Sequence, residues 1–167
     1  MPYADHFRLT DDLIVHLDTT VGASGNAFIE ARYTGFLAVS AVTVYELAIK
    51  TIFQEFAERK HRILANFTSV YFDRINGRIR VNAIKSDYLK KYGPEYVDAF
   101  ALKLDEVEKA FLKSDAVSTT TSYENVITWR NEFAHEGRVP STATYGEVKA
   151  AYSHGKRVIE CLAHAMA

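Results

Sequence analysis

The stretch TSYENVITWRNEFAHEG, from Thr121 to Gly137, predicts a single helix with one apolar face. Thr121 and Glu124 have the spacing of a capping box, in which side chains satisfy free backbone N–H groups at a helix start. Gly137 follows the last periodic residue, where helices often end in the left-handed conformation. Apolar residues recur between these signals at three- and four-residue steps, at Tyr123, Val126, Ile127, Phe133 and Ala134.

Arg130 projects from the middle of this apolar face, because successive helical residues are about 100° apart. Asn131 and His135 lie one turn apart along the edge of the same face. A cation on a packing face is costly unless something pairs with it. Two interpretations stay open. One is structural: either an ion pair, for which Glu46 is a candidate partner although a solvated Glu46 is the simpler reading, or an arginine whose stem lies on apolar surface while its head reaches solvent. The other is a site that holds a fixed cation beside an imidazole and an amide.

Composition places the chain among ordinary globular proteins. Of its 167 residues, 48% are hydrophobic and 25% are charged, and the net charge is -1. Any attraction to nucleic acid must therefore come from a local patch. The single cysteine, Cys161, excludes an internal disulfide and fits a reducing cytosol. With no signal-peptide pattern and no apolar run read as membrane-spanning, we expect one cytoplasmic domain over residues 1–167 that does not bind membranes.

Helical periodicity recurs along the whole chain. We expect helices over about 10–20, 27–60, 84–92, 94–112, 121–137 and 144–166, with Thr10 and Asn26 as N-caps and a second capping box at Thr144 and Glu147. Asn76-Gly77 is a hairpin signal, but an isolated hairpin is only marginally stable, so a helix that ends near Asn76 is preferred. The prediction is an all-α, up-and-down bundle of four or five helices with additional short helices.

The middle of the chain is basic. A charged run of this kind is either a solvated face or a surface for an anionic ligand, and both interpretations stay open. The cations that could guide an RNA backbone are Arg78, Arg80, Lys85, Lys90 and Lys91.

Arg130, Asn131 and His135 have the chemistry that RNA cleavage without a metal requires. Histidine transfers protons near neutral pH, and arginine binds a phosphate bidentately while it stays charged. Asn131 can orient either the imidazole or a phosphate oxygen. No glycine-rich phosphate loop or zinc-ligand spacing is present, so neither a metal site nor a cofactor is expected. One motif supplies one good proton-transfer residue, and a two-fold dimer would bring two together.

Arg130, Asn131 and His135, within ITWRNEFAHEG, resemble the R-x(4–6)-H motif of the HEPN superfamily. Arg157 and His164 also satisfy the spacing but lack the polar second residue. The middle segment and the motif look most like HEPN proteins of the RiboL-PSP or MAE-28990 type. The resemblance implies a homodimeric, metal-independent endoribonuclease with a composite site at the dimer interface. Such proteins commonly act as toxins or anti-phage defence effectors, beside a cognate antitoxin or defence partner.

Two other functions remain open. A non-catalytic HEPN-like binding or accessory module would act through a partner protein, with Arg130 as a structural or partner-facing cation. Buried Arg130 side chains paired with carboxylates, together with an inaccessible His135, would favour that module. An unrelated helical bundle with an accidental motif is the third possibility.

Overall fold

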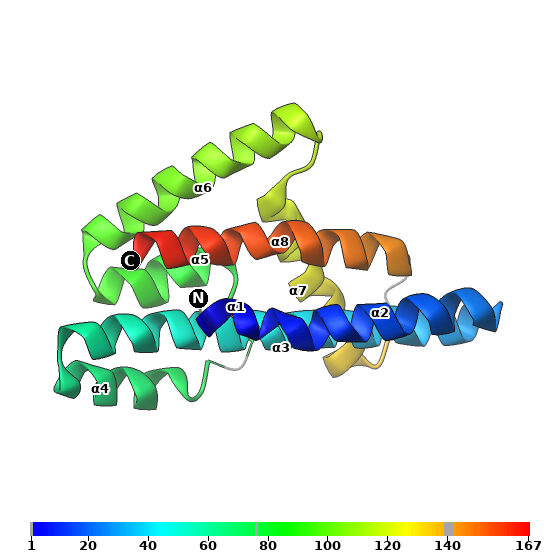
Figure 1. Ribbon diagram of the computed structural model, residues 1–167, viewed down its shortest axis with the longest axis horizontal. Helices are drawn as coiled ribbons and strands as arrows, with labels where there is room; N and C mark the ends of the chain where they lie inside the picture. Colours follow the sequence, from blue (N-terminus) through cyan, green and yellow to red (C-terminus); the bar gives the residue numbers. More distant parts are fainter. Residues whose placement is uncertain (1, 76, 139–141) are drawn as a thin grey trace.

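A computed structural model describes residues 2–75, 77–138 and 142–167, the side chains of residues 22 and 24 excepted (Figure 1). The described residues form helices and no strand, so the predicted all-α class is confirmed. The elements are α1 (Pro2–Asp5), α2 (Phe7–Ser24), α3 (Ala27–Lys60), α4 (Arg62–Phe72), α5 (Val81–Ala83), the π-helical turn η1 (Ile84–Tyr88), the 3₁₀ turn η2 (Leu89–Lys91), α6 (Pro94–Ser114), α7 (Thr119–Glu136) and α8 (Tyr145–Ala165).

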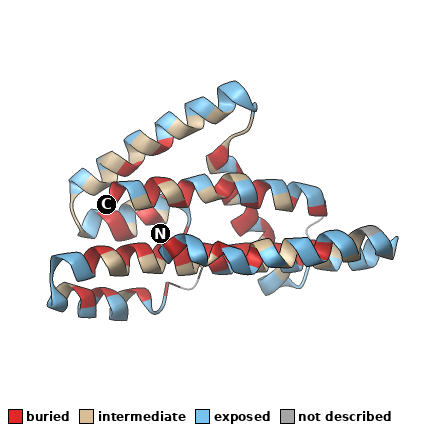
Figure 2. Cartoon of the chain, in the orientation of Figure 1, coloured by how far each residue is buried: buried red, intermediate tan, exposed pale blue. Residues whose placement is uncertain are grey.

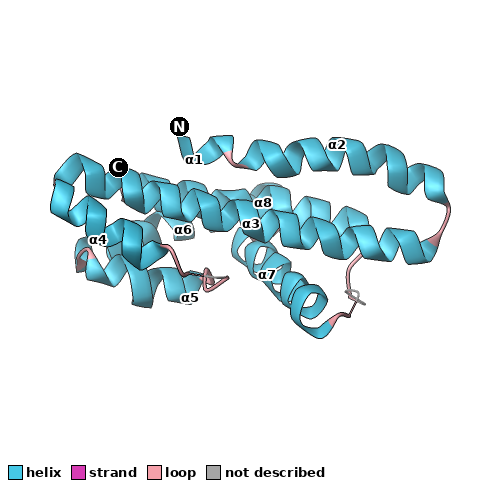
Figure 3. Cartoon of the chain, turned by 90° about the horizontal axis from the view of Figure 1, so that it is seen from below, coloured by secondary structure: helices cyan, strands magenta, loops and turns pink. Residues whose placement is uncertain are grey.

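Helix α3 is the axis around which the bundle is built. Asn26 begins it, as predicted, because its side chain accepts hydrogen bonds from the backbone N–H groups of Phe28 and Ile29. Helices α2 and α4 fold back along α3 from its two ends, and α8 packs beside it (Figures 1 and 3). Helix α7 crosses α3 and α8 steeply, and its C-terminal end projects beyond them (Figure 3).

Three tyrosines form the centre of the core where α3, α7 and α8 meet. The Tyr45 ring stacks on Tyr123 at 5.0 Å and on Tyr152 at 5.7 Å between centroids. Its hydroxyl donates to the backbone carbonyl of Tyr152 at 2.7 Å. Gly155 makes room for this arrangement, since a Cβ there would overlap the Tyr45 hydroxyl. The buried side chains run along this junction, while α6 stays largely exposed (Figure 2).

The start of the chain differs from the prediction. Helix α2 begins at Phe7, so Thr10 lies inside the helix and is not its N-cap. The Thr10 side chain is buried and shares a 2.8 Å hydrogen bond with Ser40 of α3. The helix also continues past its predicted end near residue 20, and Gly25 ends it with a left-handed φ of 55°. Packing along α3 thus overrides the local cap signal at Thr10.

The segment from 61 to 91 contains a helix and then a loop, as preferred over a hairpin, but the boundaries differ from the prediction. Helix α4 ends at Phe72, before the predicted end near Asn76, and Asn76 itself lies outside the described residues. The predicted helix over 84–92 begins three residues earlier, at Val81, and runs through α5, η1 and η2 to Lys91. Pro94 opens α6 and the Thr144–Glu147 capping box opens α8, as predicted. Residues 139–141, between the helices predicted over 121–137 and 144–166, lie outside the described residues.

Helix α3 corrects one expectation drawn from the sequence. By length and composition it would be able to cross a membrane, because an 18-residue window has a mean hydropathy of 1.6. However, 56% of that window is buried inside the protein, as in the core helix of a globular bundle. No other described helix passes the same test.

Candidate active site

The start of α7, the helix that carries the motif, is held by Ser118 and by Glu108 of α6. The Ser118 hydroxyl oxygen accepts the backbone N–H of Thr121 at 3.0 Å. One Glu108 oxygen accepts the Thr119 hydroxyl at 2.6 Å and the Thr120 backbone N–H at 3.1 Å. Partial burial alone would raise the pKa of Glu108, but these hydrogen bonds outweigh it and the pKa lies below its usual value. The helix therefore starts at Thr119, before the predicted cap.

Glu124 does not form the predicted capping box with Thr121. Its carboxylate accepts the backbone N–H of Val81 at 2.8 Å and pairs with Arg80 at 2.5 Å. Arg80 also donates to the Thr128 hydroxyl at 3.1 Å. These contacts tie α7 to the start of α5, so Arg80, predicted to bind RNA, is engaged within the fold.

Arg130, Asn131 and His135 come together at the C-terminal end of α7. Nη1 of Arg130 donates to Oδ1 of Asn131 at 2.9 Å and to Nε2 of His135 at 2.9 Å. Asn131 thus contacts the guanidinium rather than the imidazole, and its predicted contact with a phosphate oxygen stays a prediction. Gly137 ends the helix with φ 65°, as predicted. His135 is exposed and Arg130 is half-buried, so the pair is open at one side.

Most of the hydrogen-bonding capacity of Arg130 is unused. The two contacts occupy both protons of Nη1, which leaves the three N–H donors of Nε and Nη2 without a partner among the described residues. The structure does not form the candidate Arg130–Glu46 pair, and Glu46 is half-buried rather than the solvated side chain of the simpler reading. Glu46 instead lies within electrostatic range of Tyr88 and Tyr123, and its Oε1 is buried without a hydrogen bond from a described residue.

Gly77 lies against the guanidinium of Arg130. Its φ of 79° is left-handed, and a Cβ there would come within 3.0 Å of Arg130 Nη1. Two tyrosine hydroxyls hold the backbone of the two residues that follow Gly77. Tyr88 donates to the carbonyl of Arg78 at 2.6 Å, and Tyr123 donates to the carbonyl of Ile79 at 2.7 Å. The sequence marked Gly77 only as a turn signal, and nothing in its spacing connects it to Arg130.

The apolar face of α7 is buried only in part. Tyr123, Val126, Ile127 and Trp129 are buried, whereas Phe133 is half-buried and Ala134 is exposed. Phe133 packs on Gly35 of α3, where a Cβ would overlap its ring. The end of the predicted packing face therefore lies beside the motif and is uncovered in the single chain.

The five cations predicted to contact RNA occupy different surroundings. Besides the engaged Arg80, Lys85 is half-buried with its ammonium 5.9 Å from the centre of the Phe100 ring, and Lys90 is exposed. Arg78 and Lys91 instead line a cavity of about 370 Å³ together with Arg74. The prediction did not include Arg74 among the RNA-binding residues.

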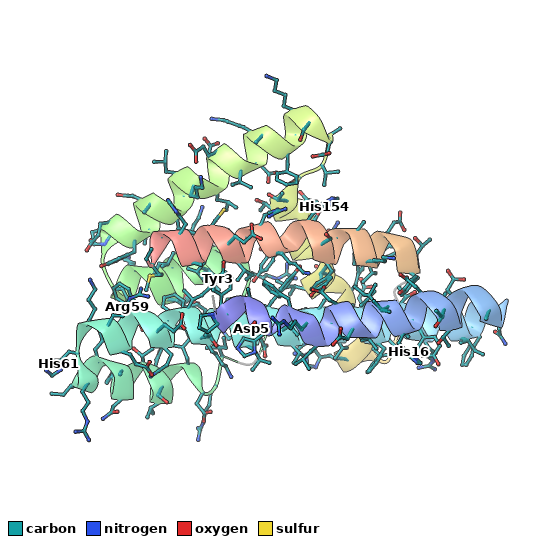
Figure 4. The ribbon with its side chains drawn as sticks, in the orientation of Figure 1. Tyr3, Asp5, His16, Arg59, His61 and His154 are labelled. Carbon is teal, nitrogen blue, oxygen red and sulfur yellow. The ribbon has the colours of Figure 1, made fainter. Side chains whose placement is uncertain are left out.

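His135 is the histidine at the motif, and the others lie elsewhere. Figure 4 shows His16 on α2, His61 between α3 and α4, and His154 on α8. His6 shares a 2.8 Å hydrogen bond with Thr51, and His164 lines a larger cavity of about 1040 Å³ together with Tyr3 and Arg59. Within the described part of the chain, no group of three or more His, Cys, Asp or Glu side chains could hold a metal ion.

Comparison with known protein families matches residues 5–167 to the family described as RiboL-PSP-HEPN. Corresponding searches of curated proteins and of solved structures found no match. The matched range includes Arg130, Asn131 and His135 and covers almost the whole chain. The HEPN resemblance is thereby confirmed, and RiboL-PSP is the matched type of the two considered. The HEPN superfamily is generally associated with ribonucleases. The chain belongs to the RiboL-PSP-HEPN family.

Proposed function

We propose that this protein is a metal-independent endoribonuclease whose active site combines Arg130 and His135 from two copies of the chain. The observation that carries the proposal is the Arg130–His135 hydrogen bond at the open end of α7. A fixed cation with three unused donors lies there in direct contact with a proton-transfer residue. Family membership supports the same class of activity.

The reaction follows from these groups. The 2′-oxygen of RNA attacks the adjacent phosphorus as its proton passes to an imidazole nitrogen, and the bond to the 5′-oxygen breaks as that oxygen takes up a proton. The products are a 2′,3′-cyclic phosphate and a 5′-hydroxyl. Arg130 binds the phosphate oxygens bidentately and stabilises the negative charge that builds up on them. When phosphate draws the guanidinium away, Nε2 of His135 becomes free to accept a proton.

A second copy supplies the second imidazole. The reaction needs one group to remove a proton and another to donate one, while each chain brings one histidine to the motif. The surface beside the motif suits a partner chain. Phe28, Ile29 and Phe36 of α3 are 66%, 37% and 49% exposed, near the Gly35–Phe133 contact. A two-fold interface that covers these side chains would bring the two motifs together.

The non-catalytic module is the second candidate. It was expected to pair Arg130 with carboxylates and to make His135 inaccessible. The structure has an exposed His135 and no ion pair between Arg130 and a described carboxylate, which weighs against that reading. The accidental-bundle interpretation is set aside because the family match extends over residues 5–167.

The cellular role that fits this activity is that of a toxin or an anti-phage defence effector. An enzyme that cuts RNA without a metal cofactor must be restrained by something other than metal supply. A cognate antitoxin or defence partner protein would provide that restraint. Support for this role comes from the HEPN family resemblance.

The test is to incubate mixed cellular RNA with purified wild-type protein or His135→Ala in excess EDTA. We expect the wild type to release fragments with 2′,3′-cyclic phosphate ends and His135→Ala to release none. His16→Ala, which removes an exposed histidine of α2, is the matched control and should cleave like the wild type. Cleavage that disappears in EDTA, or that His135→Ala retains, would refute the proposal.

A further inference from the structure

A basic cavity opens beside the turn that contacts Arg130. It has a volume of about 370 Å³ and lies between the end of α4, the turn that follows, η1 and η2. Arg74, Arg78 and Lys91 line it with three cations, against the single carboxylate of Asp87. A concave surface with excess positive charge concentrates anionic ligands. Its volume suits a nucleotide better than a lone phosphate.

The two arginines are available to a ligand. Arg74 is exposed and makes no hydrogen bond or ion pair with the described residues. Arg78 approaches Asp87 only to 3.5 Å, with side chains that are 75% and 40% exposed. Asp87 also accepts the Ser86 hydroxyl at 2.8 Å. An ion pair that is long and exposed contributes little to the stability of the fold, so an anion can bind both guanidinium groups.

The walls of the cavity are held by tyrosines. The Tyr88 hydroxyl donates to the carbonyl of Arg78 at 2.6 Å, and the Tyr71 hydroxyl donates to that of Asp87 at 3.2 Å. Burial raises the pKa of Tyr88 to about 12, so its hydroxyl keeps the proton it donates. Lys91 lies over the Tyr71 ring, 4.0 Å from its centre, and donates to its hydroxyl. The cations are thus presented by a preformed surface.

We infer that this cavity holds a nucleotide of the RNA strand close to the one that is cleaved. Arg74 and Arg78 bind its phosphate, and Asp87 accepts a hydrogen bond from its ribose 2′-hydroxyl. The inference rests on the proposed ribonuclease function. The cavity lies near Arg130, because Arg78, which lines it, directly follows Gly77 in the chain, and Gly77 lies against the Arg130 guanidinium. A strand with its scissile phosphate at Arg130 therefore passes the cavity within a few nucleotides.

The experiment measures how tightly a labelled single-stranded RNA binds to His135→Ala protein at several salt concentrations. Arg74→Gln and Arg78→Gln, each added to that background, should weaken binding by about tenfold. Each should also lower the slope of log affinity against log salt by about 0.7. Arg62→Gln is the matched control, since it removes an exposed arginine at the other end of α4 and should leave both quantities unchanged. Asp87→Ala should reduce the preference for RNA over DNA of the same sequence.

Unchanged RNA binding in both Arg74→Gln and Arg78→Gln would overturn the inference. A second arm titrates uridine 5′-monophosphate. If that nucleotide binds through Arg74 while RNA binding does not depend on Arg74, the cavity is a site for free nucleotides and the RNA assignment is wrong. The measurement is RNA binding by a variant that does not cleave. A wild-type protein that fails to cut RNA would therefore refute the proposed function without changing the measured dependence of RNA binding on Arg74 and Arg78.

Discussion

Arg130 donates a hydrogen bond from Nη1 to Nε2 of His135 over 2.9 Å, and this contact selects the tautomer of the neutral imidazole. A guanidinium has donors only, so Nε2 must be the acceptor and a neutral His135 carries its proton on Nδ1. A protonated imidazole cannot accept this bond. Three N–H donors of Arg130 stay available to a phosphate beside this bond, and the proposed reaction requires Nη1 to release Nε2 so that this nitrogen can accept a proton.

The first prediction concerns this tautomer. In wild-type protein at a pH where His135 is neutral, ring ¹⁵N chemical shifts should show a protonated Nδ1 and an unprotonated Nε2. Arg130→Met, which keeps an unbranched side chain but removes every donor, should abolish that preference. His16, which is exposed, serves as an internal reference whose signals do not change. A His135 with the proton on Nε2 in the wild type would contradict the hydrogen bond.

The second prediction concerns Gly77. Gly77→Ala should destabilise the fold by about 1–2 kcal/mol because of its left-handed φ. It should also lower RNA cleavage, because the new methyl group would meet Arg130 Nη1 at 3.0 Å. Gly25→Ala is the matched control, with φ 55° and nothing within 4 Å of the added Cβ. It should lose similar stability in thermal unfolding and keep its activity. Equal activities in the two variants would exclude a role for the Gly77–Arg130 contact.

The third prediction is a pH dependence of stability. The pKa of Glu108 is lowered in the folded state, so its stabilising effect is present above its unfolded pKa of about 4.3 and is lost as pH falls through the folded value. Glu108→Gln should therefore cost about 1 kcal/mol at pH 7, as for a lost helix cap, and progressively less below about pH 4.

Urea unfolding at several pH values measures this difference. Asp98→Asn, which removes an exposed carboxylate of the same helix, is the control and should match the wild type at pH 7. A Glu108→Gln deficit that persists unchanged into acid would show that the charge of Glu108 is not what stabilises the start of α7.

The fourth prediction concerns the composite site. If each site needs His135 from both chains, activity should fall with the square of the wild-type fraction when wild type and His135→Ala are mixed and allowed to exchange subunits. An equal mixture should then retain about a quarter of the wild-type activity, against about a half for independent chains. The control mixture of wild type with His16→Ala should lose none. A value near a half would contradict a two-histidine site.

Local signals in the sequence predicted several features of the fold correctly. The Asn26 cap, the Thr144–Glu147 box and the Gly137 helix end each depend on side chains within a few residues of the backbone that they satisfy. The motif could be found for the same reason, because Arg130, Asn131 and His135 are neighbours on a single helix.

Contacts between distant residues could not be predicted. Glu124 has the spacing of a capping box with Thr121 but binds Arg80 and Val81, more than forty positions earlier in the chain. Glu108 likewise reaches α7 from another helix and moves its start. The approach of Gly77 to Arg130 depends on how the whole bundle packs. In each case tertiary contacts decide which of several local options a side chain takes.

The most direct measurement is the cleavage rate of a defined RNA oligonucleotide in excess EDTA by the wild type, Arg130→Met, His135→Ala and His16→Ala, with thermal unfolding to check that each variant is folded. Arg130→Met and His135→Ala should each lose at least about 100-fold in rate, while His16→Ala retains the wild-type rate. A folded His135→Ala or Arg130→Met that cleaves as fast as the wild type would show that the pair on α7 is not the catalytic centre.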